Sequence, residues 1–317
     1  MKVFITRKIP ALAEETLINK GVGVTVFKKD RSITSDELIK GAKNADGIIS
    51  LLTDKIDKNV IDQLPNCKVI ANYAVGYNNI DIVYAGEKGI VVTNTPDILT
   101  DATADIAMAL MLACARRIPD GEEMMRSDKF VGWKPQLLLG IELRGKTVGI
   151  IGAGRIGQET ARRAKAFGTN IIYYNRSLKP EFEKETGAKK VSLNKLLKTS
   201  DIISLHVPLN DKTMHMLNSE NMELMKERAI LINTARGEVV DEKYLIKMLR
   251  EKRIFSAGFD VYYNEPKVNK ALLKLKNAVL LPHLGSATFE ARDGMAKLAA
   301  DNILNVLNTK KAITPVN

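Results

Sequence analysis

Three polar residues near the C-terminal end of the sequence could act together on one substrate. Arg236, Glu265 and His283 each come shortly after a run of apolar, largely β-branched residues. A guanidinium can grip a carboxylate with two N–H groups, and a histidine can donate a proton to a developing alkoxide. Reduction of a keto acid requires such a cation, such an acid and a group that tunes the acid, besides the hydride. The three residues therefore indicate chemistry on a small carboxylate that carries a carbonyl group.

The sequence has three histidines, and their surroundings distinguish them. His283 directly follows an apolar run, which places it at the carboxyl end of an expected strand. Ligands bind at the carboxyl ends of strands in α/β sheets. His206 also ends an apolar run, and we consider it a weaker candidate that could line a cofactor cleft. His215 is expected at the surface or in packing. Taken singly, Arg236, Glu265 and His283 could be a surface ion pair, a turn residue and a core histidine, but together they favour a site.

A glycine-rich segment supplies the second chemical signal. Gly152-Ala153-Gly154-Arg155-Ile156-Gly157 follows an apolar run and opens an amphipathic stretch. In this pattern Gly152 permits a tight turn, Gly154 lets the backbone approach a pyrophosphate, and Gly157 allows close packing of helix on strand. The helix N-terminus then offers N–H groups to phosphates. This context predicts a dinucleotide-binding site, and the alternative is a glycine turn without a ligand.

The residues after the next apolar run bear on the choice of cofactor. An NAD site usually has an acidic residue there, which hydrogen-bonds the ribose 2′-hydroxyl. This sequence has Asn175, Arg176 and Ser177 instead, with Lys179 close by. No carboxylate repels a 2′-phosphate, and the arginine can pair with it. We therefore predict NADP as the preferred cofactor. The alternative is that Arg176 stacks on adenine and that NAD is used as well.

Short β-branched runs alternate with amphipathic stretches along the whole chain, which favours parallel β-α-β units. We predict a first series of strands at 2–6, 24–27, 47–50, 69–73 and 90–94, and a second series at 147–151, 170–174, 201–206, 229–234, 256–261 and 278–281. Helical patterns include 11–19, 36–43, 82–88, 101–117, 156–166 and 289–307, and Thr34 with Glu37 forms a capping-box pattern.

These elements predict an α/β fold with two Rossmann-like domains, each a doubly wound parallel sheet. The first is expected to be flavodoxin-like and discontinuous, formed by residues 1–99 plus 288–317, and to bind the substrate. The second, residues 100–287, is expected to be the dinucleotide-binding Rossmann domain. In this interpretation the final helix returns to the first domain. Residues 127–140 break the helical periodicity and are expected to form an extended arm or loop.

Composition limits the alternative functions. The 317 residues are 45% hydrophobic and carry a formal net charge of +11, but basic and acidic residues are interleaved. We therefore expect no nucleic-acid partner. The longest apolar stretch, 106–115, is too short to span a bilayer, so no membrane partner is expected. The two cysteines, Cys67 and Cys114, lack metal spacing and are expected to be reduced, and the start of the chain lacks a signal peptide pattern, which predicts a cytoplasmic protein.

Taken in order, the motifs resemble the D-isomer-specific 2-hydroxyacid dehydrogenase family, over nearly the whole chain. The segments that carry the resemblance are Gly152-x-Gly154-x-x-Gly157, Asn233-Thr234-Ala235-Arg236-Gly237, Asp260-Val261 with Glu265-Pro266, and Pro282-His283-Leu284-Gly285-Ser286. Residues 74–81 and 100–105 fit the family as well.

The resemblance implies roles for individual residues. His283 would be the proton donor in keto-acid reduction, Glu265 would hydrogen-bond it and keep it protonated as the pH rises, and Arg236 would bind the substrate carboxylate and carbonyl. Further substrate contacts would come from Leu52, the backbone at Val75 and Gly76, and Trp133. The cofactor set implied is Thr103, Gly152, Gly154, Arg155, Ile156, Gly157, Asn175, Arg176, Ser177, Val207, Pro208, Thr234, Ala235, Asp260, Gly285 and Ser286, with Asp260 facing the nicotinamide amide.

Within the family, the arm that contains Trp133 and the segment 174–177 look most similar to glyoxylate and hydroxypyruvate reductases. That likeness implies a homodimer in which Trp133 either reaches the partner's substrate site or packs at the interface. Two other hypotheses stay open: a D-lactate or other D-2-hydroxyacid dehydrogenase that uses NAD, and a dinucleotide-sensing, corepressor-like scaffold. Turnover of keto acids separates the enzymes from the scaffold.

Overall fold

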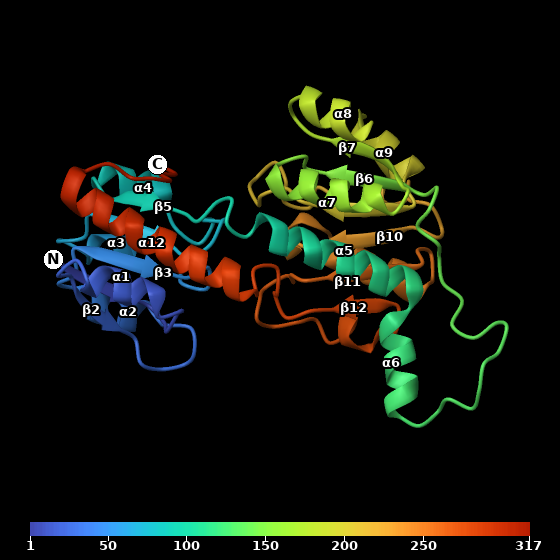
Figure 1. Cartoon of the computed structure of the whole chain (residues 1–317), viewed down its shortest axis with the longest axis horizontal. Helices are drawn as coiled ribbons and strands as arrows, with labels where there is room; N and C mark the ends of the chain where they lie inside the picture. Colours follow the sequence, from blue (N-terminus) through green and yellow to red (C-terminus); the bar gives the residue numbers. More distant parts are fainter. The chain divides into compact units, whose positions relative to one another are not determined.

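A computed structural model describes residues 1–317 and divides them into two compact units. Unit 1 comprises residues 1–99 and 287–317, and unit 2 comprises residues 100–286. The chain leaves unit 1 after Leu99 and returns to it at Ala287 (Figure 1). No helix combines the length and the apolar character needed to cross a membrane.

Unit 1 is built on a five-stranded parallel sheet with the order β2-β1-β3-β4-β5. This order is that of flavodoxin-like folds, as predicted. The strands are β1 (Lys2–Ile5), β2 (Gly23–Val26), β3 (Gly47–Ser50), β4 (Val69–Asn72) and β5 (Val91–Thr93). The helices are α1 (Leu12–Ile18), α2 (Ser35–Ala42), α3 (Lys58–Asp62), α4 (Ile82–Glu87) and α12 (Phe289–Thr309).

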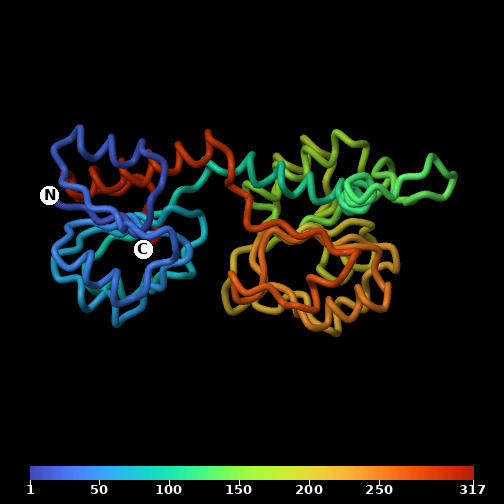
Figure 2. The backbone as a smooth tube through the Cα atoms, turned by 90° about the horizontal axis from the view of Figure 1, so that it is seen from below, coloured from blue at the N-terminus to red at the C-terminus, as the bar shows by residue number.

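The helices of unit 1 cover both faces of its sheet. The long C-terminal helix α12 packs beside α1 and against β3 and β4, whereas α2, α3 and α4 lie on the opposite face (Figure 2). The predicted capping box is present, because the Thr34 side chain accepts from the Glu37 N–H and the Glu37 carboxylate accepts from the Thr34 N–H. The return of α12 makes unit 1 discontinuous in sequence, as predicted.

Unit 2 contains a seven-stranded parallel sheet with the order β12-β11-β10-β9-β6-β7-β8. This order places β6 between β7 and β9, so the strand order reverses beside β6, as in dinucleotide-binding folds. The strands are β6 (Thr147–Ile151), β7 (Asn170–Tyr174), β8 (Lys189–Lys190), β9 (Ile202–Leu205), β10 (Ile230–Asn233), β11 (Ser256–Phe259) and β12 (Ala278–Leu280). The helices are α5 (Thr100–Arg116), α6 (Ile118–Arg126), α7 (Arg155–Ala166), α8 (Pro180–Thr186), α9 (Leu193–Thr199), α10 (Ser219–Met222) and α11 (Glu242–Arg250).

Two apolar clusters hold the helices of unit 2 on the two faces of its sheet. One cluster includes buried side chains of α5 and α7, and the other includes those of α9, α10 and α11. The prediction of six strands in this part of the chain was wrong by one, because β8 was missed. That strand consists of two exposed lysines, so it has no apolar pattern, and it forms by pairing with Ile172 and Tyr173 of β7.

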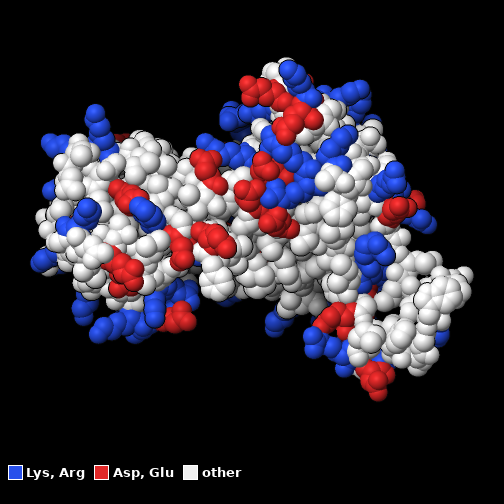
Figure 3. Space-filling model, viewed as in Figure 1, with Lys and Arg blue, Asp and Glu red and all other residues white.

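The segment from α6 to residue 140 differs from the rest of unit 2. Helix α6 has no buried residue, and the following residues contain no regular element, in agreement with the predicted arm. Its exposed apolar side chains are Ile118, Met125, Phe130, Val131, Trp133 and Leu139. In Figure 3 the loop after α6 is largely free of charged side chains, whereas acidic and basic groups are interspersed over the rest of that face.

Candidate active site

The three residues predicted to act together come from adjacent strands of unit 2. Arg236 follows β10, Glu265 follows β11 and His283 follows β12, and these strands are neighbours in the sheet. All strands of the sheet are parallel, so these residues follow the carboxyl ends of strands at one edge. Ligands bind at this edge in open α/β sheets.

His283 and Glu265 form a direct pair. Nδ1 of the imidazole lies 2.8 Å from Oε2 of the carboxylate, and both side chains are between a quarter and a third exposed. The other carboxylate oxygen, Oε1, accepts the backbone N–H of Tyr262 at 2.8 Å. Burial raises the pKa of Glu265, but the hydrogen bond and charge of His283, together with the Tyr262 N–H and the charge of Arg236, more than offset it. The resulting pKa lies below the ordinary value. Glu265 is therefore ionised. It contacts Nδ1 of His283, so Nε2 of the same imidazole remains available.

Asp260 holds the loop that carries His283. Its two carboxylate oxygens accept the backbone N–H groups of Leu284 at 2.6 Å and Gly285 at 2.7 Å. The side chain of Thr103, from α5, donates to the Gly285 carbonyl at 3.0 Å. His283 has a φ of 57°, a left-handed conformation that a non-glycine residue adopts at some cost. The loop is thus fixed from both sides, which orients the imidazole.

Arg236 lies in a turn shaped by Asn233. The Asn233 side chain donates to the Arg236 carbonyl at 2.9 Å and accepts from the Ala235 N–H at 3.0 Å. The guanidinium is half-buried, and its Nη1 donates to the Ala235 carbonyl at 2.7 Å. Burial lowers the pKa of Arg236, and the charges of Glu265 and Glu238 counteract this. The arrangement keeps a guanidinium and a carboxylate–imidazole pair on the same set of strand ends.

The glycine-rich turn has the shape that a dinucleotide requires. Gly152 has a φ of 98°, and a Cβ there would lie 2.7 Å from the His206 carbonyl oxygen. A Cβ on Gly157 would lie 2.1 Å from the carbonyl oxygen of Gly152. The first turn of α7 can therefore pack on this backbone only because residue 157 has no side chain. By contrast, a Cβ on Gly154 would meet nothing within 4 Å. The space over Gly154 is therefore open at the start of α7, where helix N–H groups favour phosphate.

A buried hydroxyl that follows β10, two strands from β6 in the sheet, also fits a bound cofactor. Oγ1 of Thr234 is buried and has no hydrogen-bond partner in the structure. Buried polar groups are nearly always paired, so an orphan at a strand end indicates a missing ligand. The unpaired Thr234 hydroxyl and the open space at Gly154 both suit a bound dinucleotide. Arg155 and Ile156 begin α7, and Ala235, Gly285 and Ser286 lie in the loops after β10 and β12.

The segment after β7 forms a compact turn. The Asn175 side chain donates to the carbonyl and to the hydroxyl of Ser177, at 3.0 and 3.2 Å. Sequence reasoning missed Lys190, on the neighbouring strand β8, whose Nζ donates to the Arg176 carbonyl at 3.0 Å. The sequence offers no signal for this contact, because the basic pair Lys189-Lys190 lacks the apolar pattern of a strand. The structure thus places a second cation beside Arg176.

The two remaining histidines, His206 and His215, differ in their burial and in their contacts. His206 is half-buried, its Nε2 lies 2.8 Å from the Ser204 hydroxyl, and burial lowers its pKa to about 3. A neutral imidazole in that position is a poor proton donor, and it precedes Val207 and Pro208 at the end of β9. His215 is exposed, with its ring 6.0 Å from that of Tyr263.

Four residues that are predicted to bind the substrate do not lie after β10, β11 or β12. Leu52 follows β3, and Val75 and Gly76 follow β4, so all three belong to unit 1, at the carboxyl edge of its sheet. Trp133 lies in the loop after α6 and is 80% exposed.

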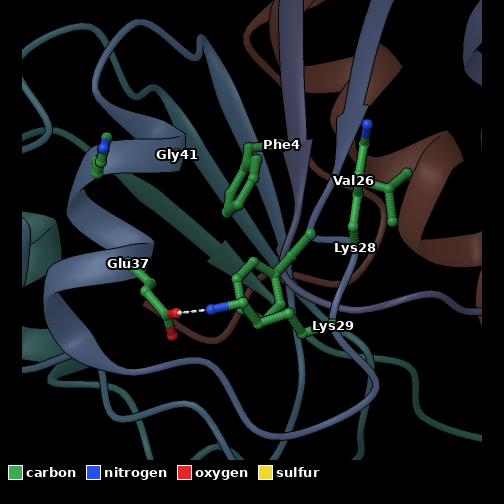
Figure 4. A pocket seen from close by; sticks show the side chains of 8 residues that line it. Phe4, Val26, Lys28, Lys29, Glu37 and Gly41 are labelled. Carbon is green, nitrogen blue, oxygen red and sulfur yellow. Dashed lines mark hydrogen bonds and ion pairs between the residues drawn. The ribbon is translucent and has the colours of Figure 1, made fainter.

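A hollow in unit 1 contains none of the predicted site residues. It is lined by Phe4, Val26, Phe27, Lys28, Lys29, Glu37, Lys40 and Gly41 (Figure 4). Lys29 and Glu37 form an ion pair of 3.1 Å at its rim. Three of the lining residues are aromatic or aliphatic and four are charged, but they bring together no histidine–carboxylate pair of the kind found in unit 2.

Comparison with known proteins agrees with this geometry. Residues 108–285 match the model of the D-isomer specific 2-hydroxyacid dehydrogenase, NAD binding domain. A glyoxylate reductase of Thermococcus litoralis is 52% identical over 307 residues, which cover 96% of this chain and 92% of the relative. The chain therefore belongs to the D-isomer-specific 2-hydroxyacid dehydrogenase family, whose members are NAD(P)-dependent oxidoreductases.

Solved structures show the same fold. The TT0316 protein of Thermus thermophilus is 42% identical, with a TM-score of 0.94 and full coverage of both chains. An NADPH-dependent glyoxylate/hydroxypyruvate reductase of Sinorhizobium meliloti, solved with NADP and malonate, is 33% identical with a TM-score of 0.87. That likeness covers 99% of this chain and 96% of the other.

Proposed function

We propose that the protein reduces small 2-keto acids, with glyoxylate and hydroxypyruvate as substrates, to glycolate and D-glycerate. The observation that carries this proposal is the His283–Glu265 pair of 2.8 Å on strand ends of the unit that also contains the glycine cradle. The relatives named glyoxylate reductase support this substrate class over D-lactate, and the intact acid–base pair supports an enzyme over a scaffold.

Each residue of the set has a proposed role. His283, oriented by Glu265, donates the proton that the keto oxygen receives, and it is left neutral until solvent reprotonates it. Arg236 binds the substrate carboxylate and polarises the carbonyl, because a guanidinium presents two parallel N–H donors. The nicotinamide, when bound, supplies the hydride that the carbonyl carbon accepts. Unit 1 is proposed to bind substrate, through Leu52, Val75 and Gly76, and unit 2 to bind the cofactor.

For the cofactor we propose a preference for NADP(H). The turn at Asn175 presents the Ser177 hydroxyl and the Arg176 side chain without a carboxylate at the end of β7. Lys190 adds a cation that is anchored on the Arg176 carbonyl. A 2′-phosphate is a dianion at neutral pH, so a site with two cations and a hydroxyl favours it over a ribose hydroxyl. Thr103, Thr234, Ala235, Asp260, Gly285 and Ser286 are proposed to surround the nicotinamide half.

We further propose a homodimer that forms through α6 and the loop after it. The apolar side chains of this segment are exposed, with Val131 at 81% and Trp133 at 80%, and a second copy of the chain would cover them. Both cysteines are buried and free, which fits the proposed cytoplasmic location.

The test is steady-state turnover of glyoxylate, hydroxypyruvate and pyruvate with NADPH and with NADH. We expect glyoxylate and hydroxypyruvate to be the better substrates. His283→Ala should lower kcat at least about 100-fold, as expected for a lost general acid, and Arg236→Ala should both raise the KM for the keto acid and lower kcat, because Arg236 binds the carboxylate and polarises the carbonyl. His215→Ala is the matched control, since that histidine is exposed. A protein that binds NADPH but reduces no keto acid would refute the proposal and favour the scaffold.

A further inference from the structure

Three successive carbonyl groups after β4 are all held by donors of unit 1. The Ala74 carbonyl accepts from the Thr95 N–H at 2.9 Å. The Val75 carbonyl accepts from Nδ2 of Asn94 at 2.8 Å, and the Gly76 carbonyl accepts from Nδ2 of Asn72 at 2.8 Å. A loop whose carbonyls are each engaged in this way cannot rotate its peptide planes freely.

The fixed carbonyls determine where the N–H groups point. In a trans peptide, the N–H of the next residue is directed opposite to the carbonyl. The N–H groups of Val75, Gly76 and Tyr77 are therefore directed away from their anchors, and within unit 1 none of the three has a hydrogen-bond partner. Val75 and Gly76 are half-buried and Tyr77 is exposed. Unpaired backbone N–H groups at the carboxyl edge of a sheet are available to donate to an anion.

The two asparagines are themselves fixed. Asn72, fully buried at the end of β4, accepts from the Ser50 hydroxyl at 3.1 Å through Oδ1, so its Nδ2 faces the Gly76 carbonyl. The backbone of Asn94 is bound by the C-terminal tail, since the Thr314 hydroxyl donates to the Asn94 carbonyl at 2.6 Å. Thr314 is in turn held by Asn302 of α12. The returning C-terminal segment thus supports the loop.

A third asparagine connects this loop with the one after β3. Nδ2 of Asn79 donates to the carbonyls of Leu51 and Asp54, at 3.1 and 3.0 Å. Asp54 is 1% exposed and accepts from the Leu51 N–H at 2.7 Å and the Thr6 hydroxyl at 2.5 Å. The loop that carries Leu52 and the loop that carries Val75 are therefore fixed relative to each other.

From this arrangement we infer that Asn94 and Asn72 are positioning residues for the substrate carboxylate. They hold the Val75 and Gly76 carbonyls back, so that the N–H groups of Val75, Gly76 and Tyr77 are preorganised for the carboxylate of a keto acid. This inference rests on the proposed function for its substrate, but the anion-binding loop can be tested without turnover. Preorganised donors lower the cost of binding because no peptide must reorient.

The variants are Asn94→Ala, Asn94→Asp and Asn72→Ala. Asn94→Asp retains the size of the side chain but cannot donate when ionised, and Asn94→Ala removes the donor without adding a charge. An effect shared by the two variants therefore reports the lost donor. Asn317→Ala is the matched control, because its amide also bonds two carbonyls of unit 1, those of Ile82 and Ile90, and neither belongs to residues 74–77. If one variant does not fold, as judged by its Tm, the other asparagine still provides the test.

Two measurements are made on the full chain. In kinetics, both Asn94 variants and Asn72→Ala should raise the KM for glyoxylate roughly tenfold, as for a lost hydrogen bond to an ion. The KM for NADPH and kcat should change much less, and Asn317→Ala should resemble the wild type. In amide NMR of the protein loaded with NADP⁺, oxalate should shift the signals of Val75, Gly76 and Tyr77 in the wild type and not in the Asn94 variants at the same concentration.

Unchanged KM values in folded Asn94 and Asn72 variants would overturn the inference. So would oxalate binding that leaves these three amide signals in place. If the wild type reduces no keto acid, the proposed function fails, whereas the oxalate titration still decides whether the loop binds a carboxylate.

Discussion

The imidazole Nδ1 of His283 lies 2.8 Å from the carboxylate Oε2 of Glu265, although each residue lies in a different loop of unit 2. The contact depends on β11 and β12 being neighbours in the sheet. It also depends on Asp260, which holds the N–H groups of Leu284 and Gly285 and so fixes the loop of His283. The pair is the arrangement expected of an acid whose proton must be available near neutral pH.

Glu265→Gln should lower kcat/KM for glyoxylate. The glutamine keeps the size of the side chain but lacks the negative charge, so it holds the imidazole of His283 less firmly. We expect a loss of roughly tenfold or more in steady-state kinetics at neutral pH. Glu220→Gln, an exposed glutamate of the same unit, is the control and should leave kcat/KM unchanged.

The same pair predicts a pH dependence of folding stability. Because the pKa of Glu265 in the folded protein is lower than the ordinary 4.5, its ionised form contributes stability at and above that pH. The contribution is lost only as the pH falls through the lower folded value. The difference in free energy of unfolding between the wild type and Glu265→Gln, from urea denaturation, should thus be steady above about pH 4.5 and shrink in more acidic solution. A difference that grows with acidification would contradict this assignment.

Gly154→Ala should retain the fold but lose cofactor. A Cβ at this position meets nothing within 4 Å in the protein, so the Tm should stay within a few degrees of the wild type. The methyl group would instead occupy the space through which the pyrophosphate approaches the backbone. We expect the Kd for NADPH, measured by fluorescence titration, to rise at least about tenfold.

Gly157→Ala is the contrasting variant, because a Cβ there lies 2.1 Å from the Gly152 carbonyl oxygen and should also lower the Tm. Tight NADPH binding by Gly154→Ala would argue against a pyrophosphate site at Gly154.

Arg176→Ala and Lys190→Ala should each reduce the preference for NADPH over NADH. Removal of either cation weakens the attraction of a 2′-phosphate but leaves a ribose hydroxyl unaffected. We expect the ratio of the two kcat/KM values to fall roughly fivefold or more for each variant, and more steeply for Arg176→Ala. Binding of 2′,5′-ADP, followed by calorimetry, should weaken in parallel. Lys189→Ala, the preceding residue of β8, is the control. A wild-type enzyme that prefers NADH would refute the cofactor proposal.

Val131→Asp should weaken the proposed homodimer. The side chain is 81% exposed, so the substitution costs the isolated subunit little, but it places a charge where we propose that a second copy packs. Sedimentation velocity should show a shift from dimer to monomer at micromolar concentration. Trp133→Ala then separates two possibilities: loss of glyoxylate turnover in an intact dimer would indicate that Trp133 contacts the partner's substrate, whereas dimer dissociation would indicate packing.

The residue pattern alone predicts the fold class and the strand ends on which Arg236, Glu265 and His283 lie. Periodicity is a local property, so alternating β-branched and amphipathic runs predict parallel strands, and the two sheets have the predicted arrangement. The glycine spacing is local as well, since Gly152, Gly154 and Gly157 act within one strand–helix turn. For the same reason β8 was missed, because two exposed lysines acquire strand geometry only by pairing with β7.

Which groups meet depends on contacts between segments that are distant in the sequence. Lys190 reaches the Arg176 carbonyl because β8 lies beside β7, and no spacing in the sequence expresses that pairing. Likewise, Asn72 and Asn94 hold consecutive carbonyls of one loop because β4 and β5 are adjacent, with the C-terminal segment bound to Asn94 from far along the chain. Hydrogen bonds between distant residues depend on sheet order and loop closure, which residue types alone do not encode. The sequence therefore predicts the side chains that we propose to react, and the fold shows the residues that hold them in place.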